Sequence, residues 1–305
     1  MKIALISTVF NEGDDIVAWA KALAAQTRHP DEFVIVDGGS TDGTPDRLRQ
    51  VFAGGTFPEP RIIIEKCNIA RGRNLAIQNT TAEIIAATDA GCVARADWLA
   101  EITRPLLADA APDVCGGASV RLLQNDFHRF LEQLDPEPPA PAYGEDCYPS
   151  SRNIAFRRQA WLDVGGYPEW LTLTAEDALF NFQLHVIGRK FFCNPRAIVD
   201  WPARPDEAGY FKMLRGYGYG AAEAQLYGPY FRRRLLLTLC PPLLLLSQHR
   251  FKYFGFRYRK NAASGTGWLA GLWQGRRAPK DWRQVRGVLL SPAAQRCLEP
   301  QALKK

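Results

Sequence analysis

The sequence predicts an α/β protein in which a mainly parallel, doubly wound sheet is flanked by helices and followed by a mostly helical, basic C-terminal extension. Three observations support this prediction. Short β-branched segments alternate with helical segments over about 190 residues, as in βαβ units. The chain of 305 residues has room for roughly two domains. Residues 1–200 carry 19 Lys and Arg against 27 Asp and Glu, whereas residues 201–305 carry 19 against 5.

The composition excludes several classes of protein. Hydrophobic residues make up 47% and charged residues 23% of the chain, which is ordinary for a globular protein and excludes a disordered or collagen-like one. The seven cysteines include no C-x-x-C pair, which argues against a disulfide framework or zinc knuckle and favours a reducing, cytosolic compartment. Acidic residues follow the first ten residues at once, so we expect a buried strand there and no signal peptide.

The expected elements of the first half follow from periodicity and β-branched content. Four short strands are expected over Ile3–Val9, Phe33–Val36, Arg61–Ile64 and Ile84–Thr88. Helices are expected over Asp14–Gln26, from a cap at Thr44, over Ile69–Gln78 and, after Asp97, over Trp98–Leu107. Asp135–Pro149 holds five prolines, so we expect a loop that covers a substrate site, followed by a strand at Ser150–Phe156.

Acidic, polar loops follow three of these strands. They contain Glu12 after the first strand, Asp37 and Asp42 after the second, and Asp89 after the fourth. Because parallel strands place their carboxyl ends at one edge of the sheet, we expect a ligand site there. No G-x-G-x-x-G follows a strand and no G-x-x-x-x-G-K-[ST] occurs, so neither a dinucleotide fingerprint nor a P-loop is present.

Taken in order, the motifs resemble glycosyltransferase family 2 over about residues 1–200. They are F-N-E-G at 10–13, V-D-G-G-S-T-D-G-T at 36–44, A-R-G-R-N-L-A at 70–76, T-D-A-G at 88–91 and E-D at 176–177. The resemblance implies the GT-A fold and an inverting enzyme that uses a nucleotide-activated sugar and a divalent cation.

The resemblance also implies roles for residues of the nucleotide-sugar site. Thr8 and Glu12 would line the pocket for base and ribose, and Arg73 would meet the diphosphate. Asp37 would hydrogen-bond the nucleobase, and because a carboxylate accepts from the imide N–H of uracil, a UDP-linked donor is expected. Asp-Gly-Gly-Ser segments also form turns and caps, and that is the alternative role of Asp37.

Asp89 is the expected cation ligand and a further contact to the donor. The family has a D-x-D motif, but this sequence has Asp89-Ala90-Gly91 in its place. The dependence on Mg²⁺ or Mn²⁺ is therefore open. These cations accept one or two carboxylates together with phosphates and water. A single carboxylate is therefore sufficient if the diphosphate supplies the other ligands.

The E-D pair, Glu176 and Asp177, supplies the expected catalytic carboxylates. Inverting transfer needs a general base that takes the proton of the acceptor hydroxyl, and the resemblance assigns that role to Asp177. The alternative is that Thr174-x-x-Asp177 is a capping box at the start of a helix reaching about Ile187. If so, the base lies in the preceding loop, at Glu145 or Asp146.

Residues 1–200 are predicted to form the glycosyltransferase domain, with a nucleotide-sugar half at 1–100 and an acceptor half at 101–200. Residues 201–305 form a basic, aromatic region that we expect to lie against an anionic membrane. The apolar run Leu235–Leu246 reaches roughly 18 Å as a helix, against about 30 Å for a bilayer core, so it cannot cross alone. Shallow insertion is expected, and a buried helical hairpin is the alternative.

These features predict a peripheral or monotopic enzyme at the cytoplasmic face of the membrane. It would act on a glycan or lipid-linked acceptor in the synthesis of a cell-envelope polysaccharide or glycolipid. Two other functions compete. A sugar nucleotidyltransferase needs a glycine-rich, basic loop after the first strand, but Asn11–Asp15 is acidic. A non-catalytic scaffold would bind nucleotide sugar without turnover, or would bind nucleic acid through the aromatic and basic tail, and nucleic acid is the less favoured partner.

Overall fold

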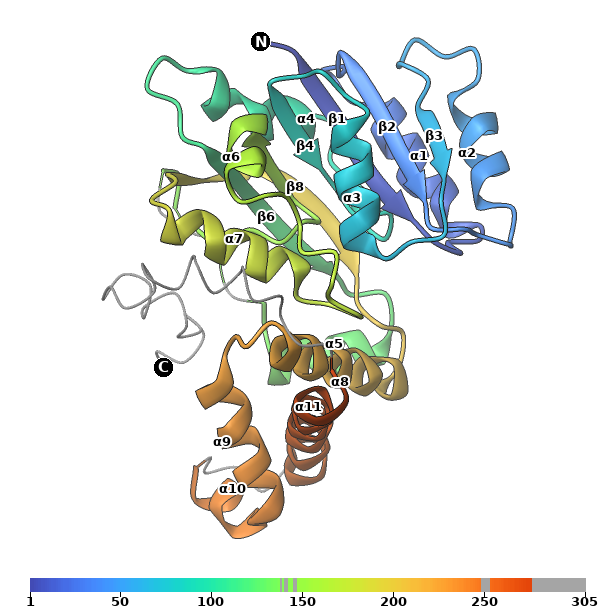
Figure 1. Ribbon diagram of the computed structural model, residues 1–305. Coiled ribbons are helices and arrows are strands. Elements are labelled where there is room, and N and C mark those ends of the chain that lie inside the picture. The colour runs from blue at the N-terminus through green and yellow to red at the C-terminus, as the bar shows by residue number, and fades with distance from the viewer. Residues whose placement is uncertain (138, 140–141, 145–146, 248–252, 276–305) are drawn as a thin grey trace. The chain divides into compact units, whose positions relative to one another are not determined.

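The computed structural model describes residues 1–137, 139, 142–144, 147–247 and 253–275 (Figure 1). Two compact units make up the chain. The first unit comprises Met1–Tyr167 and Gly188–Ala203, and the second comprises Pro168–Ile187 and Arg204–Lys305.

Within the described residues of the first unit, eight strands form one sheet in the order β3-β2-β1-β4-β7-β6-β8-β5 (Figure 1). Strands β1 to β4 are mutually parallel, β6 is parallel to β8, and β7 runs antiparallel between β4 and β6. The short strand β5 pairs antiparallel with β8 at the edge. The strand bounds are Ile3–Val9 (β1), Glu32–Asp37 (β2), Arg61–Ile64 (β3), Ile84–Ala87 (β4), Val93–Ala94 (β5), Val114–Leu122 (β6), Ile154–Arg157 (β7) and Phe191–Pro202 (β8).

Helices cover both faces of this sheet. Helices α1 and α2 lie on one face and α3 on the other, as right-handed crossovers require (Figure 1). Apolar side chains of α1, α2 and α4, with Trp19 and Trp98 among the largest, pack on the sheet as the main core. The helix bounds are Asp15–Ala24 (α1), Thr44–Phe52 (α2), Ile69–Gln78 (α3), Trp98–Thr103 (α4), Asp126–Leu134 (α5) and Arg158–Asp163 (α6).

The four strands expected in the first half are confirmed, and two details of the helices are wrong. Thr44 is not the cap of α2 but its first residue, because Gly43 in the left-handed region (φ 84°) is the N-cap. The hydroxyl of Thr44 instead donates to Asp42 Oδ1 at 2.6 Å. The helix expected over Trp98–Leu107 is α4 followed by a 3₁₀ turn, Arg104–Leu107, which contains Pro105.

Strands β6 and β8 are long elements that the sequence does not predict. Gly116 and Gly117 in β6, and Pro195 in β8, are residues that weaken a strand pattern. The register of the pair shifts between Gly117 and Ala118. Glycine is required at 117, because a Cβ there would lie 2.2 Å from the carbonyl oxygen of Ala197.

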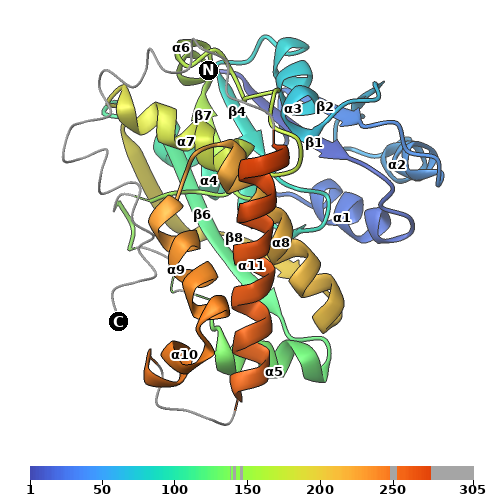
Figure 2. The ribbon, with the colours of Figure 1, turned by 60° about the horizontal axis from the view of Figure 1, so that its bottom comes forward.

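The second unit is helical in its described residues. Helices α8 and α11 lie side by side along their length (Figure 2). Glycines make this approach possible, because a Cβ at Gly218 would lie 2.2 Å from Ser264 O and one at Gly267 would lie 2.1 Å from Arg215 O. Among the described residues, no helix is both long and apolar enough to cross a membrane. The helix bounds are Glu176–Val186 (α7), Glu207–Glu223 (α8), Gly228–Leu239 (α9), Pro241–Ser247 (α10) and Phe254–Gln274 (α11).

Candidate active site

The loops after β1, β2 and β4 meet at one edge of the sheet in the first unit. The amide of Asn11 donates to Ser40 Oγ at 2.8 Å, and the amide of Gly13 donates to Asp42 Oδ2 at 2.7 Å, which ties the first loop to the second. The hydroxyl of Ser7 donates to the carbonyl of Thr88 at 2.7 Å, which ties β1 to the end of β4. The three predicted acidic loops therefore form one continuous rim.

Asp37 ends β2 and is fully buried. Its Oδ1 accepts hydrogen bonds from the amides of Gly39 at 2.9 Å and Ser40 at 2.6 Å, so the alternative turn-forming role is real. Its Oδ2 is also buried, and the described part of the chain offers that atom no hydrogen bond. An unsatisfied buried acceptor costs about 1–3 kcal/mol, which a ligand N–H would recover.

Glu12 and Thr8 stand at the end of β1. Burial raises the pKa of Glu12, the amide of Phe10 opposes that rise, and the charges of Asp89, Asp15 and Asp42 add to it. The negative charge of Asp89 therefore acts on the carboxyl group of Glu12. Thr8 is half-buried. Helix α3 passes close above it, since a Cβ at Gly72 would lie 2.8 Å from Thr8 Cγ2.

Arg73 in α3 points to the end of β4 and not to open solvent. Its side chain is 4% exposed, and Nη2 donates to Asp89 Oδ1 at 2.8 Å. The guanidinium also lies 5.4 Å from the ring centroid of Tyr167. Arg71 faces the opposite side of the helix, where Nε donates to Glu65 Oε1 at 3.0 Å. Arg73, the residue expected to meet the diphosphate, therefore lies against Asp89 at the end of β4, whereas Arg71 pairs with Glu65.

The donor set at this rim fits a cation that a diphosphate helps to hold. The described residues contain no group of three or more His, Cys, Asp or Glu side chains arranged to hold a metal ion by themselves. Asp89 is 36% exposed, and Oδ1 is the oxygen bonded to Arg73. One carboxylate combined with phosphate oxygens is a common way to bind Mg²⁺ or Mn²⁺.

Two asparagines of this region were missed from the sequence. The Oδ1 of Asn74 accepts from the indole of Trp161 at 2.9 Å and from the amide of Tyr167 at 2.8 Å. The side-chain amide of Asn153 donates to the carbonyls of Ala118 at 2.7 Å and Ala197 at 2.9 Å. The bonds of Asn74 fix the segment around Tyr167 and those of Asn153 fix the β6–β8 pair, and nothing in the local sequence pattern indicates them.

Asp177 and Glu176 lie in the second unit, in the first turn of α7. The capping-box alternative is wrong, because the N-cap is not Thr174 but Ala175, which lies in the left-handed region (φ 75°) and makes no side-chain capping hydrogen bond. The hydroxyl of Thr174 donates instead to Gly216 O at 3.0 Å. Asp177 Oδ1 accepts from the amide of Ala178 at 2.7 Å. Glu176 is buried.

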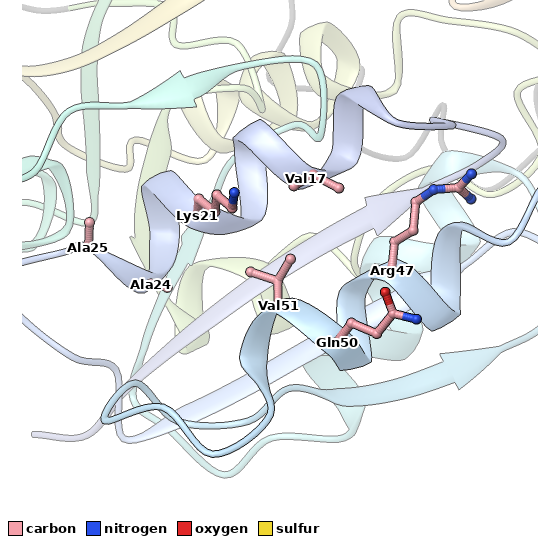
Figure 3. Close-up of a pocket in the computed structure, with 7 residues that line it drawn as sticks. All are labelled: Val17, Lys21, Ala24, Ala25, Arg47, Gln50 and Val51. Carbon is pink, nitrogen blue, oxygen red and sulfur yellow. The ribbon is translucent and has the colours of Figure 1, made fainter.

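Parts of the predicted substrate loop, with the alternative bases Glu145 and Asp146, lie outside the described residues. A groove of about 550 Å³ is present elsewhere in the first unit, between α1 and α2 (Figure 3). It contains none of the predicted site residues. The residues lining it are Val17, Lys21, Ala24, Ala25, Arg47, Gln50 and Val51.

Comparison with known proteins gives matches of sequence and of fold. The family model described as Glycosyl transferase family 2 matches residues 4–161. Glycosyltransferase AglE of Haloferax volcanii is 29% identical over 117 residues, a match that spans 38% of this chain and 38% of that protein.

Two solved structures have similar folds. One is the mannosyltransferase PcManGT from Pyrobaculum calidifontis in complex with GDP-Man and Mn²⁺, with a TM-score of 0.64 at 17% identity over 90% of this chain and 88% of that one. The other is residues 1–349 of S. aureus TarS in complex with UDP, with a TM-score of 0.54 at 17% identity over 93% and 92%. Similarity at this level of identity concerns the fold, and it confirms the predicted GT-A architecture.

Proposed function

The chain belongs to glycosyl transferase family 2, and on that basis we propose that it transfers a sugar from a UDP-linked donor to a hydroxyl group of an acceptor. Asp37 carries the proposal. Its buried Oδ2 has no hydrogen bond within the described residues and stands at the carboxyl edge of the sheet. An acceptor atom in that position matches the imide N–H of uracil. Thr8 and Glu12 then line the base and ribose.

Asp89 is the residue that would hold a divalent cation together with the donor diphosphate. Bound there, Mg²⁺ or Mn²⁺ supplies positive charge to the departing diphosphate. Arg73 orients Asp89 through their 2.8 Å ion pair and neutralises part of its charge. The GDP-Man and Mn²⁺ named for PcManGT and the UDP named for TarS are consistent with such a site.

Asp177 is the proposed general base. It takes the proton of the acceptor hydroxyl while that oxygen forms a bond to the anomeric carbon, and the bond from that carbon to the diphosphate breaks on the opposite side. The nucleoside diphosphate therefore leaves, and the sugar is attached to the acceptor oxygen with inverted anomeric configuration. Glu176 is the second carboxylate of the pair and is held in the first turn of the same helix, α7.

The acceptor we propose is membrane-linked, because the second unit exposes apolar and basic side chains together. Arg232, Leu236 and Leu239 lie on one face of α9 at positions i, i+4 and i+7. Leu236 is 59% and Leu239 is 73% exposed, and Leu243 in α10 is 44% exposed. Apolar side chains beside cations suit the head-group layer of an anionic bilayer. Association with the cytoplasmic face of the membrane is part of this proposal.

Thermal denaturation with UDP and with GDP, each with and without Mn²⁺, tests the nucleotide site. Saturating UDP is expected to raise Tm by several degrees and more than GDP does. Incubation of UDP-sugars with a membrane lipid extract then tests the reaction. A glycosyltransferase releases nucleoside diphosphate, whereas a nucleotidyltransferase releases inorganic diphosphate. A chain whose Tm responds to neither nucleotide would contradict the proposed function.

A further inference from the structure

The carboxylate of Glu223, the last residue of α8, is buried in the second unit. Its Oε2 accepts a hydrogen bond from the amide of Thr172 at 2.9 Å, and its Oε1 accepts one from the hydroxyl of the same residue at 2.7 Å. Hydrogen bonds to a carboxylate are shorter and stronger than those between neutral groups. The side chain therefore ties α8 to the backbone and the side chain of Thr172 at once.

The segment that follows Thr172 is also held by α8. The hydroxyl of Thr174 donates to Gly216 O, and a Cβ at Gly220, one helical turn later, would lie 2.4 Å from Thr174 O. Glycine is therefore required at 220 for this close approach. On the other side of Thr172, Leu171 is buried in an apolar cluster together with residues of α7. The chain is thus fixed from 171 to 174 before α7 begins.

Ala175 links this fixed segment to α7 in an unfavourable backbone conformation. Its φ of 75° lies in the left-handed region, where a Cβ is crowded. Such a conformation persists only where the surrounding structure imposes it. The carbonyl of Ala175 accepts from the amide of Leu179 at 2.9 Å and so begins the helix. The contacts that hold 171–174 on α8 therefore also orient the first turn of α7, which contains Asp177.

The side chain of Glu223 is itself held by the end of α11. A Cβ at Gly275, the C-cap of α11, would lie 2.6 Å from Glu223 Cγ, so the backbone there packs directly on the glutamate. Glu207, the first residue of α8, provides a contrast, because its side chain is 37% exposed and pairs with Arg259. Of these two carboxylates of α8, the buried one is bonded to the segment that leads into α7.

We propose that Glu223 is a positioning residue for Asp177, a role that rests on the proposed function. Through Thr172 it fixes the segment that leads into α7 and, with it, the direction of the Asp177 carboxylate. A general base must be aligned with the acceptor hydroxyl to take its proton, and a misplacement of about 1 Å can lower a rate about a hundredfold. Glu223 acts only through this alignment, so donor binding does not depend on it.

Glu223→Gln in the full chain tests this role. Glutamine has the same shape but keeps only one of the two acceptor oxygens, so one bond to Thr172 is lost. Incubation of UDP-glucose, UDP-galactose or UDP-N-acetylglucosamine with a membrane lipid extract measures UDP release. We expect kcat to fall about ten- to hundredfold with UDP affinity unchanged. Hydrogen exchange of the peptide covering 171–178 should become faster. Glu207→Gln, in the same helix, is the matched control and should change neither kcat nor exchange.

Thr172 provides a second test, because it is exposed and its substitution leaves the core intact. Thr172→Val keeps the shape of the side chain but loses the hydroxyl donor, so kcat should fall. Thr172→Ser keeps that donor and should restore kcat towards the wild-type value. The matched control is Thr266→Val, because Thr266 is exposed on α11 and its hydroxyl donates to Ala262 O of its own helix. Near-UV circular dichroism shows whether each variant keeps the fold.

The double variant of Asp177→Asn with Glu223→Gln separates positioning from general stability. If Glu223 acts through Asp177, the residual rate of Asp177→Asn falls no further. An equal fold-loss in both backgrounds overturns the assignment while the proposed function stands. Wild-type kcat in folded Glu223→Gln and Thr172→Val does the same, and so does a lower kcat with unchanged exchange of 171–178. Wild-type chain that releases UDP from none of the three donors overturns the proposed function and this assignment together.

Discussion

Nη2 of Arg73 lies 2.8 Å from Oδ1 of Asp89, and this ion pair joins α3 to the turn after β4. The pair is asymmetric, since the arginine side chain is 4% exposed and the aspartate side chain is 36% exposed. Leaving the buried guanidinium without a partner would cost more free energy than leaving the partly exposed carboxylate unpaired, because water can solvate only the carboxylate. Asp89 is therefore held in a defined orientation at the edge where the nucleotide sugar is proposed to bind.

A double-mutant cycle on this pair should give a measurable coupling energy. Arg73→Met, Asp89→Asn and the double variant are compared by urea denaturation, and we expect a coupling of about 1–3 kcal/mol in the free energy of unfolding. The control cycle uses Arg71 and Glu65, whose side chains are 37% and 39% exposed, and for which we expect less than about 1 kcal/mol. Equal coupling in the two cycles would contradict the buried character of the Arg73 pair.

Asp177→Asn should remove turnover without removing donor binding. Asparagine keeps the oxygen that accepts from the amide of Ala178 but cannot take the acceptor proton. The expected loss is about 10²- to 10⁴-fold in kcat at saturating donor, with UDP affinity unchanged. The control is Glu207→Gln, which changes a partly exposed carboxylate of the same unit that pairs with Arg259. Near-normal transfer by Asp177→Asn would assign the base to another residue.

Removing the exposed leucines of α9 should weaken membrane binding. Leu236→Gln with Leu239→Gln is expected to lower sedimentation with vesicles of phosphatidylserine and phosphatidylcholine, because apolar insertion is lost. Binding of the wild type should fall as salt screens the basic side chains. The control is Leu269→Gln, a change at a residue that is 47% exposed on α11. Equal loss in both variants, or binding that ignores salt, would argue against α9 as the contact.

The cysteines should differ sharply in their reaction with iodoacetamide. Burial raises the pKa of both Cys92 and Cys115 to about 12, and a raised thiol pKa means that only about 10⁻⁴ of either is thiolate at pH 8. Cys240 is exposed. Peptide-resolved mass spectrometry should therefore find Cys240 modified in the native protein, and Cys92 and Cys115 modified only after unfolding. Early modification of Cys115 in native protein would mean that β6 is less protected than described.

The first half of the fold was predictable because its signals are local. Strands β1 and β4 are short, mainly apolar segments. Helix α3 is preceded by its N-cap Asn68, whose side chain accepts from the amide of Arg71. The sequence does not predict β6 and β8, because their pairing accommodates a register shift that depends on residues far apart in the chain. Asn153 lies beside that shift and donates to the backbone carbonyl of Ala118. No local sequence pattern predicts that a buried asparagine makes this contact.

The residues of the candidate site that lie at the ends of strands were predictable from the sequence. Asp37 is the last residue of β2 and Asp89 lies two residues after the end of β4, so topology alone brings them to one edge. The ion pair between Asp89 and Arg73 depends on a tertiary contact and was not predictable. The glycines of 216–220, which resemble a phosphate-binding loop, instead belong to α8, where Gly218 meets the backbone of α11. Glycine-rich motifs need a strand-to-helix context before they indicate a ligand.

Calorimetric titration of UDP into wild type and Asp37→Asn tests the central claim most directly. Asparagine is isosteric and retains an oxygen for the amides of Gly39 and Ser40, but it places an NH₂ group where Oδ2 now stands. This NH₂ group and the imide N–H of uracil would be two donors facing each other. We therefore expect the free energy of UDP binding to weaken by about 1.5–3 kcal/mol, while Tm without ligand stays near the wild-type value. Asp46→Asn, which alters an exposed carboxylate of α2, should leave UDP binding unchanged. Equal UDP affinity in wild type and folded Asp37→Asn would contradict the nucleotide site described for this edge of the sheet.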